Sequence, residues 1–188
     1  MIATIKTLPH YFPHIFVERV ILSALIIVAL CVLWSVLFIR KKIRIKQFVA
    51  LLVLSFYVVF VYYYTVIGRY SSEMYRNQIY LSYSYSRLLV DFNISSIIIQ
   101  ITLNIVMLIP VGFLCPIVFE PARRKYLRTL IIASAITLSI ELLQVVLACG
   151  TFEVEDIVNN LLGAGIGMLL HRIIFGKAGS HGKSKQKR

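Results

Sequence analysis

The stretch Leu127–Cys149, LRTLIIASAITLSIELLQVVLAC, decides the fold. Apart from Arg128 and Glu141 it carries no charged residue. A predominantly apolar stretch of about 20 residues is the length needed to cross roughly 30 Å of hydrocarbon as a helix. The stretch is therefore predicted to span a membrane, and the presence of an acid at Glu141 has to be explained within that setting.

Four more blocks of similar length and composition occur along the chain. Of its 188 residues, 59% are hydrophobic, which exceeds the roughly half expected of a soluble domain. We therefore expect an all-α integral membrane protein, a bundle of about five transmembrane helices. Residues 1–175 are predicted to form a single transmembrane domain, and 176–188 a basic, disordered cytoplasmic tail. The other predicted spans are Ile15–Ile39, Phe48–Ile67, Ile94–Phe119 and Asp156–Phe175.

The formal net charge of +12 comes from positive residues that lie between the apolar blocks. Most of the Lys and Arg residues fall in three segments, 40–47, 120–128 and the tail from Arg172. Cytoplasmic loops of membrane proteins carry such an excess. We therefore expect a multi-pass protein of the cell membrane with its N-terminus outside and its C-terminus in the cytoplasm. Membrane topology explains the charge better than nucleic-acid binding, so no nucleic-acid partner is expected.

The three cysteines, Cys31, Cys115 and Cys149, show no CxxC motif and no Cys/His pair at metal-ligand spacing. Cys31 and Cys115 fall inside predicted spans, where free cysteine commonly serves as a small apolar core residue. Neither a metal site nor a bound cofactor is expected.

Glu141 lies about eight residues from the outer end of its predicted span, which places it roughly 12 Å deep at 1.5 Å per residue. A charged side chain facing lipid at that depth would cost several kcal/mol. Glu141 must therefore face the bundle interior or a wet cavity, or be protonated. Gln144 lies on the same face of the helix, because residues three apart are neighbours on a helix surface.

The last predicted span begins with EVEDIVNNLLGAGIG, residues 153–167, which places Asp156 and Asn160 one turn apart on one face. An alternative for Asp156 is a helix-capping role, since the first turn of a helix favours negative charge. Gly163 and Gly167 form a GxxxG pattern, which lets a second helix approach closely. We expect these two glycines to serve packing.

Asn104 and Arg69 complete the set of polar residues in the outer half of the membrane. Asn104 could make an interhelical hydrogen bond, and Arg69 could be an interfacial anchor, a partner for Glu141 or Asp156, or a clamp for an anionic head group. The third span also contains Pro110, which is predicted to kink or break its helix. Together the polar residues predict a pocket open toward the outside, although a purely structural hydrogen-bond network stays open.

Four motifs occur in order along the chain. TVIGR at 65–69 is followed by LNIVMLIPVGFLCP at 103–116, SIELLQ at 139–144 and TFEVEDIVNNLLGAGIG at 151–167. In these motifs the sequence resembles the VanZ-like family of bacterial membrane proteins, over about 57–170. The chain departs from the family at Gly150, where members often have an arginine.

The resemblance implies low-level tolerance to teicoplanin and related lipoglycopeptides. Together with the predicted outward pocket, it favours a protein that binds or modifies an envelope component, either a membrane lipid or a lipid-linked envelope precursor. If the protein is an enzyme, which we leave undecided, Glu141 would be the general acid or base and Asp156 would orient a water or the substrate. The substrate-binding residues would be Arg69, Asn104, Gln144 and Asn160. Two other functions stay open, a proton-coupled transporter and a non-catalytic membrane scaffold, and a homodimer is also left open.

Overall fold

A computed structural model describes residues 8–69, 79–80 and 94–176 of the chain, without the side chains of 8–16, 79, 80 and 96. The described residues form six helical segments and two short strands. In chain order these are α1 (Leu8–Ile39), α2 (Ile45–Tyr62), the π-helix η1 (Tyr63–Ile67), β1 (Ile79–Tyr80), α4 (Ile94–Val118), α5 (Lys125–Val146), β2 (Phe152–Glu153) and α6 (Val154–Gly176).

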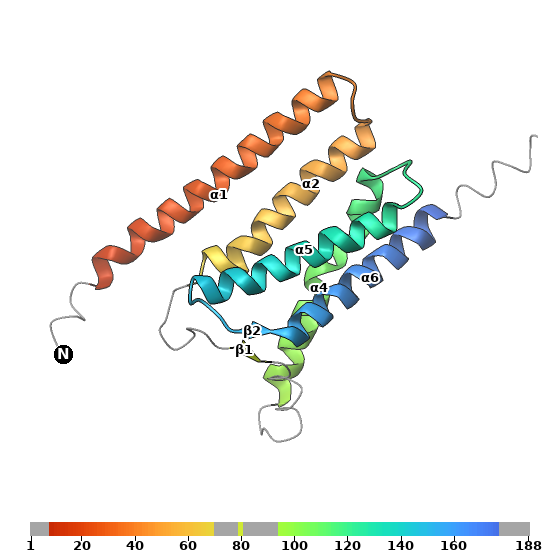
Figure 1. Cartoon of the computed structure of the whole chain (residues 1–188). Helices are drawn as coiled ribbons and strands as arrows, with labels where there is room; N and C mark the ends of the chain where they lie inside the picture. Colours follow the sequence, from red (N-terminus) through yellow and green to blue (C-terminus); the bar gives the residue numbers. More distant parts are fainter. Residues whose placement is uncertain (1–7, 70–78, 81–93, 177–188) are drawn as a thin grey trace, which may run out of the picture.

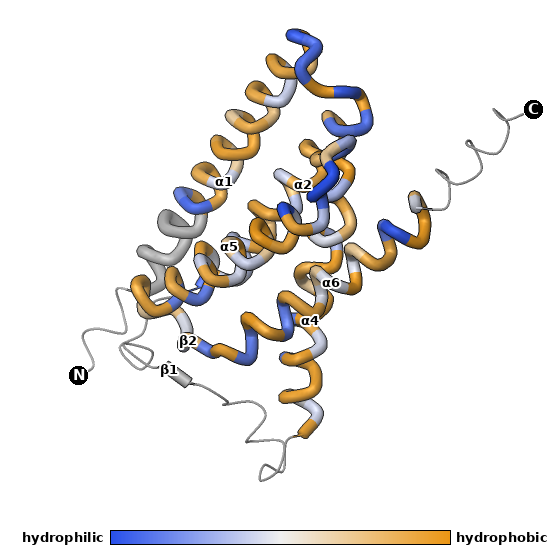
Figure 2. The backbone as a smooth tube through the Cα atoms, turned by 45° about the vertical axis from the view of Figure 1, so that its right-hand side comes forward, coloured by the Kyte–Doolittle hydropathy of each residue, from blue (hydrophilic) through white to orange (hydrophobic). Residues whose placement is uncertain are grey.

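Five stretches of helix are long and apolar enough to cross a membrane, with α2 and η1 together making one of them. They are Val17–Ile39, Ile45–Ile67, Ile97–Val118, Lys125–Val146 and Val154–Gly176. Figure 2 shows that apolar residues run the length of each helix, while hydrophilic residues gather in the turn between α1 and α2 and at the start of α6. The prediction of an all-α bundle of about five spans is confirmed. The predicted orientation of its ends remains a prediction, and so does the domain boundary, because residues 177–188 of the tail lie beyond the described chain.

Helices α2, α4, α5 and α6 pack together, and α1 lies at the edge of the bundle beside α2 (Figure 1). Trp34 of α1 donates a hydrogen bond from Nε1 to Ser55 Oγ of α2 at 2.9 Å. Most apolar side chains of α1 are exposed, for example Leu25 at 61% and Val28 at 58%. Such a surface is suited to hydrocarbon, in which an exposed apolar side chain costs nothing.

The tightest helix pair is α4 with α6, and small residues make it so. A Cβ added to Gly163 would overlap the Ile105 carbonyl of α4, and one added to Gly167 would overlap the Ile109 carbonyl. On α4, Gly112 lies equally close to the backbone of Ala164. The GxxxG pattern therefore does serve packing, as expected. This contact fixes α6 against α4 and sets the position of every side chain between them.

Helix α4 runs without a break from Ile94 to Val118, through both Pro110 and Pro116. Of the two predicted outcomes at Pro110, a kink or a break, the break is therefore wrong, and the kink stays a prediction. The Tyr57 hydroxyl of α2 donates a hydrogen bond to the Met107 carbonyl, in the turn before Pro110, at 2.7 Å. Donors from neighbouring helices are one means by which membrane helices tolerate a proline.

Helix α5 ends at Val146, earlier than the predicted Cys149. Ala148 has a positive φ of 49°, which takes the chain out of the right-handed helix. The Cys149 N–H donates to the Gln144 carbonyl and the Ala148 N–H to the Val145 carbonyl. These two hydrogen bonds form the Schellman arrangement that commonly ends a helix. The chain then turns back through Gly150 into β2, which pairs in parallel with β1.

Candidate functional site

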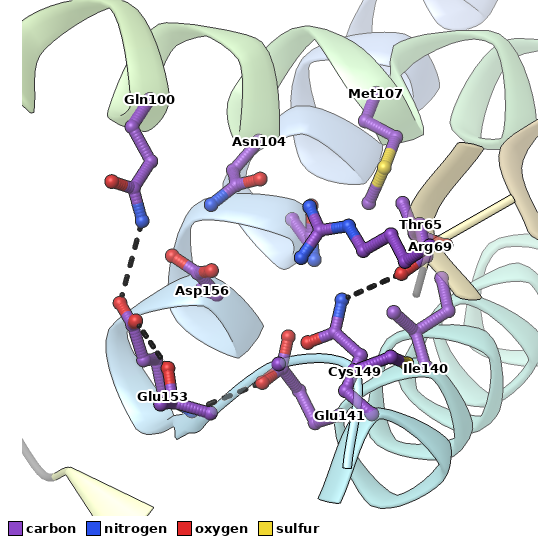
Figure 3. A pocket seen from close by; sticks show the side chains of 14 residues that line it. Thr65, Arg69, Gln100, Asn104, Met107, Ile140, Glu141, Cys149, Glu153 and Asp156 are labelled. Carbon is purple, nitrogen blue, oxygen red and sulfur yellow. Dashed lines mark hydrogen bonds between the residues drawn. The ribbon is translucent and has the colours of Figure 1, made fainter. Parts of the chain in front are cut away.

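One end of the bundle holds a polar cavity of about 580 Å³, formed where η1, α4, α5 and α6 meet (Figure 3). We call it the polar cavity. Its volume falls within the range of about 300–1,000 Å³ typical of ligand sites. It is lined by Thr65, Arg69, Gln100, Asn104, Met107, Ile140, Glu141, Gln144, Cys149, Gly150, Thr151, Glu153, Asp156 and Asn160.

All six residues singled out in the sequence line this cavity: Arg69, Asn104, Glu141, Gln144, Asp156 and Asn160. They come from four segments that are far apart in the chain, and the fold brings them together at the end where α5 finishes and α6 begins (Figure 1). The roles assigned to them stay predictions, because the geometry gives their positions and not their chemistry.

Helix α5 contributes Glu141 and Gln144, which lie on its buried face. Glu141 is 2% exposed, and its Oε2 accepts a hydrogen bond from the Glu153 backbone N–H at 3.0 Å. Gln144 donates from Nε2 to the Thr65 carbonyl at 3.1 Å. The buried acid is therefore paired with a backbone donor, which answers why a span tolerates a carboxylic acid at this depth.

The π-helix η1 supplies the acceptor of the Gln144 hydrogen bond. In a π-helix each N–H bonds to the fifth carbonyl before it, as the Gly68 N–H does to Tyr63. The widened turn ends at Gly68 and is followed by Arg69. The Arg69 guanidinium extends into the cavity toward Asp156 (Figure 3). π-Helical turns occur frequently at functional sites.

Helix α6 contributes Asp156 and Asn160 from its first two turns. Asp156 is the third residue of the helix and lies inside its first turn, not ahead of it where a capping residue would be. Asn160 is 1% exposed and donates from Nδ2 to Thr137 Oγ1 at 2.8 Å. Its Oδ1 is buried and accepts no hydrogen bond within the described part of the chain. A buried acceptor without a donor is costly and calls for an explanation.

Helix α4 forms the opposite wall with Gln100 and Asn104, one turn apart. Gln100 lies 3.5 Å from Glu153, measured from Nε2 to Oε2. Asn104 directs Nδ2 toward the Asp156 carboxylate (Figure 3), with which it interacts. The buried acceptor of the cavity that has no donor among the described residues is therefore Asn160 Oδ1.

Sequence reasoning missed several lining residues. Gln100 lies four residues before Asn104 on the same face of α4, so helical periodicity could have identified it. Glu153 precedes the predicted span Asp156–Phe175, yet it is 7% exposed and accepts from Thr151 Oγ1 at 2.8 Å. Thr65 contributes a main-chain carbonyl, for which no side-chain pattern gives a signal.

Gly150 lies next to Gln144 in the loop that closes the cavity. A Cβ at this position would come within 3.1 Å of the Gln144 side chain. An arginine here would therefore need Gln144 to move. Among the described residues that line the cavity, Arg69 is the only lysine or arginine.

At the opposite end of the bundle lies His171, which takes no part in the polar cavity. It is 1% exposed, and its Nδ1 is 3.2 Å from the Tyr126 hydroxyl. Glu120 accepts a hydrogen bond from Lys125 Nζ at 2.7 Å beside it. That hydrogen bond is the main reason why the pKa of Glu120 is lowered.

The chemistry available to the polar cavity is that of acids and amides. Within the described ranges, no three His, Cys, Asp or Glu side chains are placed to hold a metal ion. The cavity lining combines carboxylates, side-chain amides and one guanidinium. Such a set can bind a polar group through several hydrogen bonds and can position one carboxyl group for proton transfer.

Comparison with known proteins adds one match. A model of the VanZ/LLP1 family matches residues 25–175, which include every residue that lines the polar cavity. No curated protein and no solved structure matches the chain.

Proposed function

The chain belongs to the VanZ-like (VanZ/LLP1) family and is a multi-pass membrane protein, and from this premise we propose that it confers low-level tolerance to teicoplanin and related lipoglycopeptides. It does so in the cell membrane by binding or modifying an envelope component in the polar cavity. The component is a membrane lipid or a lipid-linked envelope precursor.

One observation supports this proposal above the others. Six polar residues from α4, α5, α6 and the segment just after η1 converge on one cavity at one end of the membrane-spanning bundle. Burying ionisable groups in a membrane protein is expensive, so they mark functional sites by default. The positive-inside pattern predicts that this end faces the outer side, where envelope precursors are displayed.

Within the proposal, Arg69, Asn104, Gln144 and Asn160 bind the component and Glu141 and Asp156 lie beside it. Glu141 already accepts a backbone hydrogen bond through Oε2, which leaves Oε1 to face a ligand. If a reaction occurs, Glu141 is the proton donor or acceptor and Asp156 orients the attacking group. Binding alone requires neither role.

A structural scaffold is the second candidate. The Gln144–Thr65 and Asn160–Thr137 hydrogen bonds join α5 to η1 and α6 to α5. Such bonds would hold the helices together whether or not a ligand enters. On this reading, conservative changes of the acids alter stability and leave tolerance unchanged.

Drug susceptibility of a host that expresses the protein tests the proposal. We expect the wild type to raise the inhibitory concentration of teicoplanin over an empty vector. Glu141→Gln and Asp156→Asn should abolish the increase at unchanged membrane levels, which are measured by blotting. Glu120→Gln, at the opposite end of the bundle, is the matched control and should protect like the wild type. Equal protection by all four proteins would favour the scaffold, and no protection by the wild type would overturn the proposal.

A further inference from the structure

A second hollow adjoins the polar cavity. It has a volume of about 480 Å³, and we call it the lateral groove. It lies between α2 with η1 on one side and α4 on the other. Five residues line both spaces, so the two hollows share one wall: Thr65, Arg69, Gln100, Asn104 and Met107.

The remaining lining of the lateral groove is aromatic and aliphatic, and part of it is exposed on the surface of the bundle. Phe60 is 55% exposed, Tyr64 65% and Leu103 62%, and the rings of Phe60 and Tyr64 lie 4.7 Å apart between centroids. These residues lie in or beside the membrane-spanning stretches, so they meet acyl chains. A hollow in this surface can hold an apolar chain. Because the chain comes from the surrounding hydrocarbon, it does not have to leave water to enter the hollow.

The polar atoms of the polar cavity indicate the chemistry of the head group that is attached to such a chain. Asn160 Oδ1 is a buried acceptor without a donor among the residues described, whereas Asn104 Nδ2 faces the Asp156 carboxylate. A hydroxyl group can donate to Asn160 Oδ1 and can also accept from a neighbouring amide. A fully ionised phosphate or carboxylate only accepts and leaves Asn160 Oδ1 unsatisfied.

We propose that the ligand is an amphiphile with an uncharged, hydroxyl-rich head in the polar cavity and an apolar chain in the lateral groove. This inference rests on the proposed function and names the class of envelope component. The amphiphile enters sideways through the wall formed by η1 and α4, so its chain stays in hydrocarbon throughout. Glu141 and Asp156 accept from its hydroxyls, and the amides of Gln100 and Asn104 donate to them.

An anionic lipid is the competing ligand. Arg69 favours a negative head group, but Glu141 and Asp156 line the same cavity and disfavour one. Two matched probes separate the alternatives: hexadecyl maltoside, with an uncharged sugar head, and hexadecyl phosphate, with the same chain and an anionic head.

The test is binding of these probes to the full chain in phosphatidylcholine nanodiscs, measured by native mass spectrometry of the released protein. We expect hexadecyl maltoside to bind more tightly than hexadecyl phosphate by about tenfold or more, which is a difference of roughly 1.4 kcal/mol. Equal binding of the two probes, or tighter binding of the phosphate, would overturn the assignment of the head group.

Two variants, Leu103→Trp and Asn104→Leu, and the control Leu162→Trp test the assignment of the two spaces. Leu103→Trp fills the lateral groove and should weaken binding of hexadecyl maltoside by about tenfold. Leu162→Trp places the same bulk at a residue of α6 that is 55% exposed and lies outside both hollows, and it should bind like the wild type. Asn104→Leu removes an amide that can donate to a hydroxyl group of the ligand and should weaken the maltoside more than the phosphate. Wild-type binding by Leu103→Trp would show that the chain does not use the groove.

The drug-susceptibility assay keeps this inference distinct from the proposed function. If Glu141→Gln loses tolerance while Leu103→Trp retains it and binds both probes normally, the polar cavity is functional and the lateral entry is wrong. If the wild type gives no tolerance but binds hexadecyl maltoside in the predicted way, the ligand class stands and the proposed phenotype fails.

Discussion

At the scale of single residues, Glu141 combines two properties that substitution can separate. Its carboxylate accepts the Glu153 backbone N–H, and it can also carry a charge or a proton. Glu141→Gln keeps an acceptor of the same size, whereas Glu141→Ala leaves a buried N–H without a partner, at a cost of about 1–3 kcal/mol. We therefore predict that the alanine variant unfolds at a lower temperature than the glutamine variant.

Thermal unfolding of the purified proteins in one detergent measures this difference. Thr137→Ser, which keeps the hydroxyl that pairs with Asn160, controls for a mild change nearby. Equal loss of stability in the glutamine and alanine variants would mean that the Glu153 hydrogen bond contributes little to the fold.

The pair Glu120 and Lys125 lies at the other end and predicts a dependence on pH. The hydrogen bond from Lys125 holds the pKa of Glu120 below its usual range. A group with a depressed pKa in the folded state stabilises the fold above its unfolded pKa of about 4.3, and this contribution is lost as the pH falls through the folded value. Below about pH 4, the wild type should therefore lose more stability than Glu120→Gln.

Unfolding temperatures measured over a series of acidic buffers check this prediction. The difference should be small, because Glu120 has a side chain that is 40% exposed and exposed ion pairs contribute little. Parallel curves for the two proteins across the acidic range would contradict the assignment of the shift to this pair.

The sequence identifies those residues whose polar side chains would be energetically unfavourable in contact with lipid. Glu141, Asp156 and Asn160 could be identified because a lipid-facing acid or amide is unfavourable, which requires a polar neighbourhood. The sequence does not identify residues that contribute to the cavity only through the path of the backbone. Thr65 lines the cavity because η1 presents its carbonyl to Gln144, and no side-chain pattern predicts that.

At the scale of helices, the α4–α6 contact depends on the absence of side chains. Gly163→Ala or Gly167→Ala would push a Cβ into the backbone of α4, and overpacking of this kind costs about 1–3 kcal/mol. Gly165 lies between them on the same helix with open space around its Cβ position. We predict that Gly163→Ala and Gly167→Ala are destabilised and that Gly165→Ala is as stable as the wild type or more so.

The midpoint of thermal unfolding in detergent measures these three variants under one condition. A wild-type midpoint for Gly163→Ala would show that α4 and α6 can separate without loss, and the packing account would be wrong. Because Asp156 and Asn160 lie on α6 within two turns of Gly163, Gly163→Ala should also disturb the polar cavity.

The number and type of the helices could be predicted from the sequence because length and apolar content determine a membrane span. The residues at which the helices end could not be predicted in this way. The positive φ of Ala148 ends α5 three residues early, at a residue that favours helix by propensity. Pro110 is accommodated inside α4 beside a donor from Tyr57, a tertiary contact that the sequence of α4 alone does not contain.

At the scale of the whole molecule, the charge pattern predicts which end faces out. Glu18 is exposed and adjoins Arg19, whose guanidinium donates to the carbonyl of Arg69 at the polar cavity. Lys42 is exposed in the turn between α1 and α2. With the three native cysteines replaced by alanine, Glu18→Cys should react with a membrane-impermeant maleimide in intact cells. Lys42→Cys should react only after the membrane is permeabilised.

The reverse pattern of labelling would place the N-terminus and the cavity on the cytoplasmic side. That result would remove the link between the cavity and outward-displayed precursors while leaving the fold intact. The sequence could predict a shared polar pocket because its six residues fall in one half of the membrane. Its volume and its adjoining groove depend on how four helical segments pack, and only the structure gives that.

The central claim is that the space in the polar cavity is used by a ligand, and filling that space tests it most directly. Thr151→Trp places a large side chain in the loop that lines the cavity and changes none of the six residues. The measurement is the inhibitory concentration of teicoplanin for hosts that express the wild type, Thr151→Trp or the control Leu162→Trp at matched membrane levels. We predict that Thr151→Trp loses the protection and that Leu162→Trp keeps it. Full protection by well-expressed Thr151→Trp would contradict the claim and leave the polar residues a structural network.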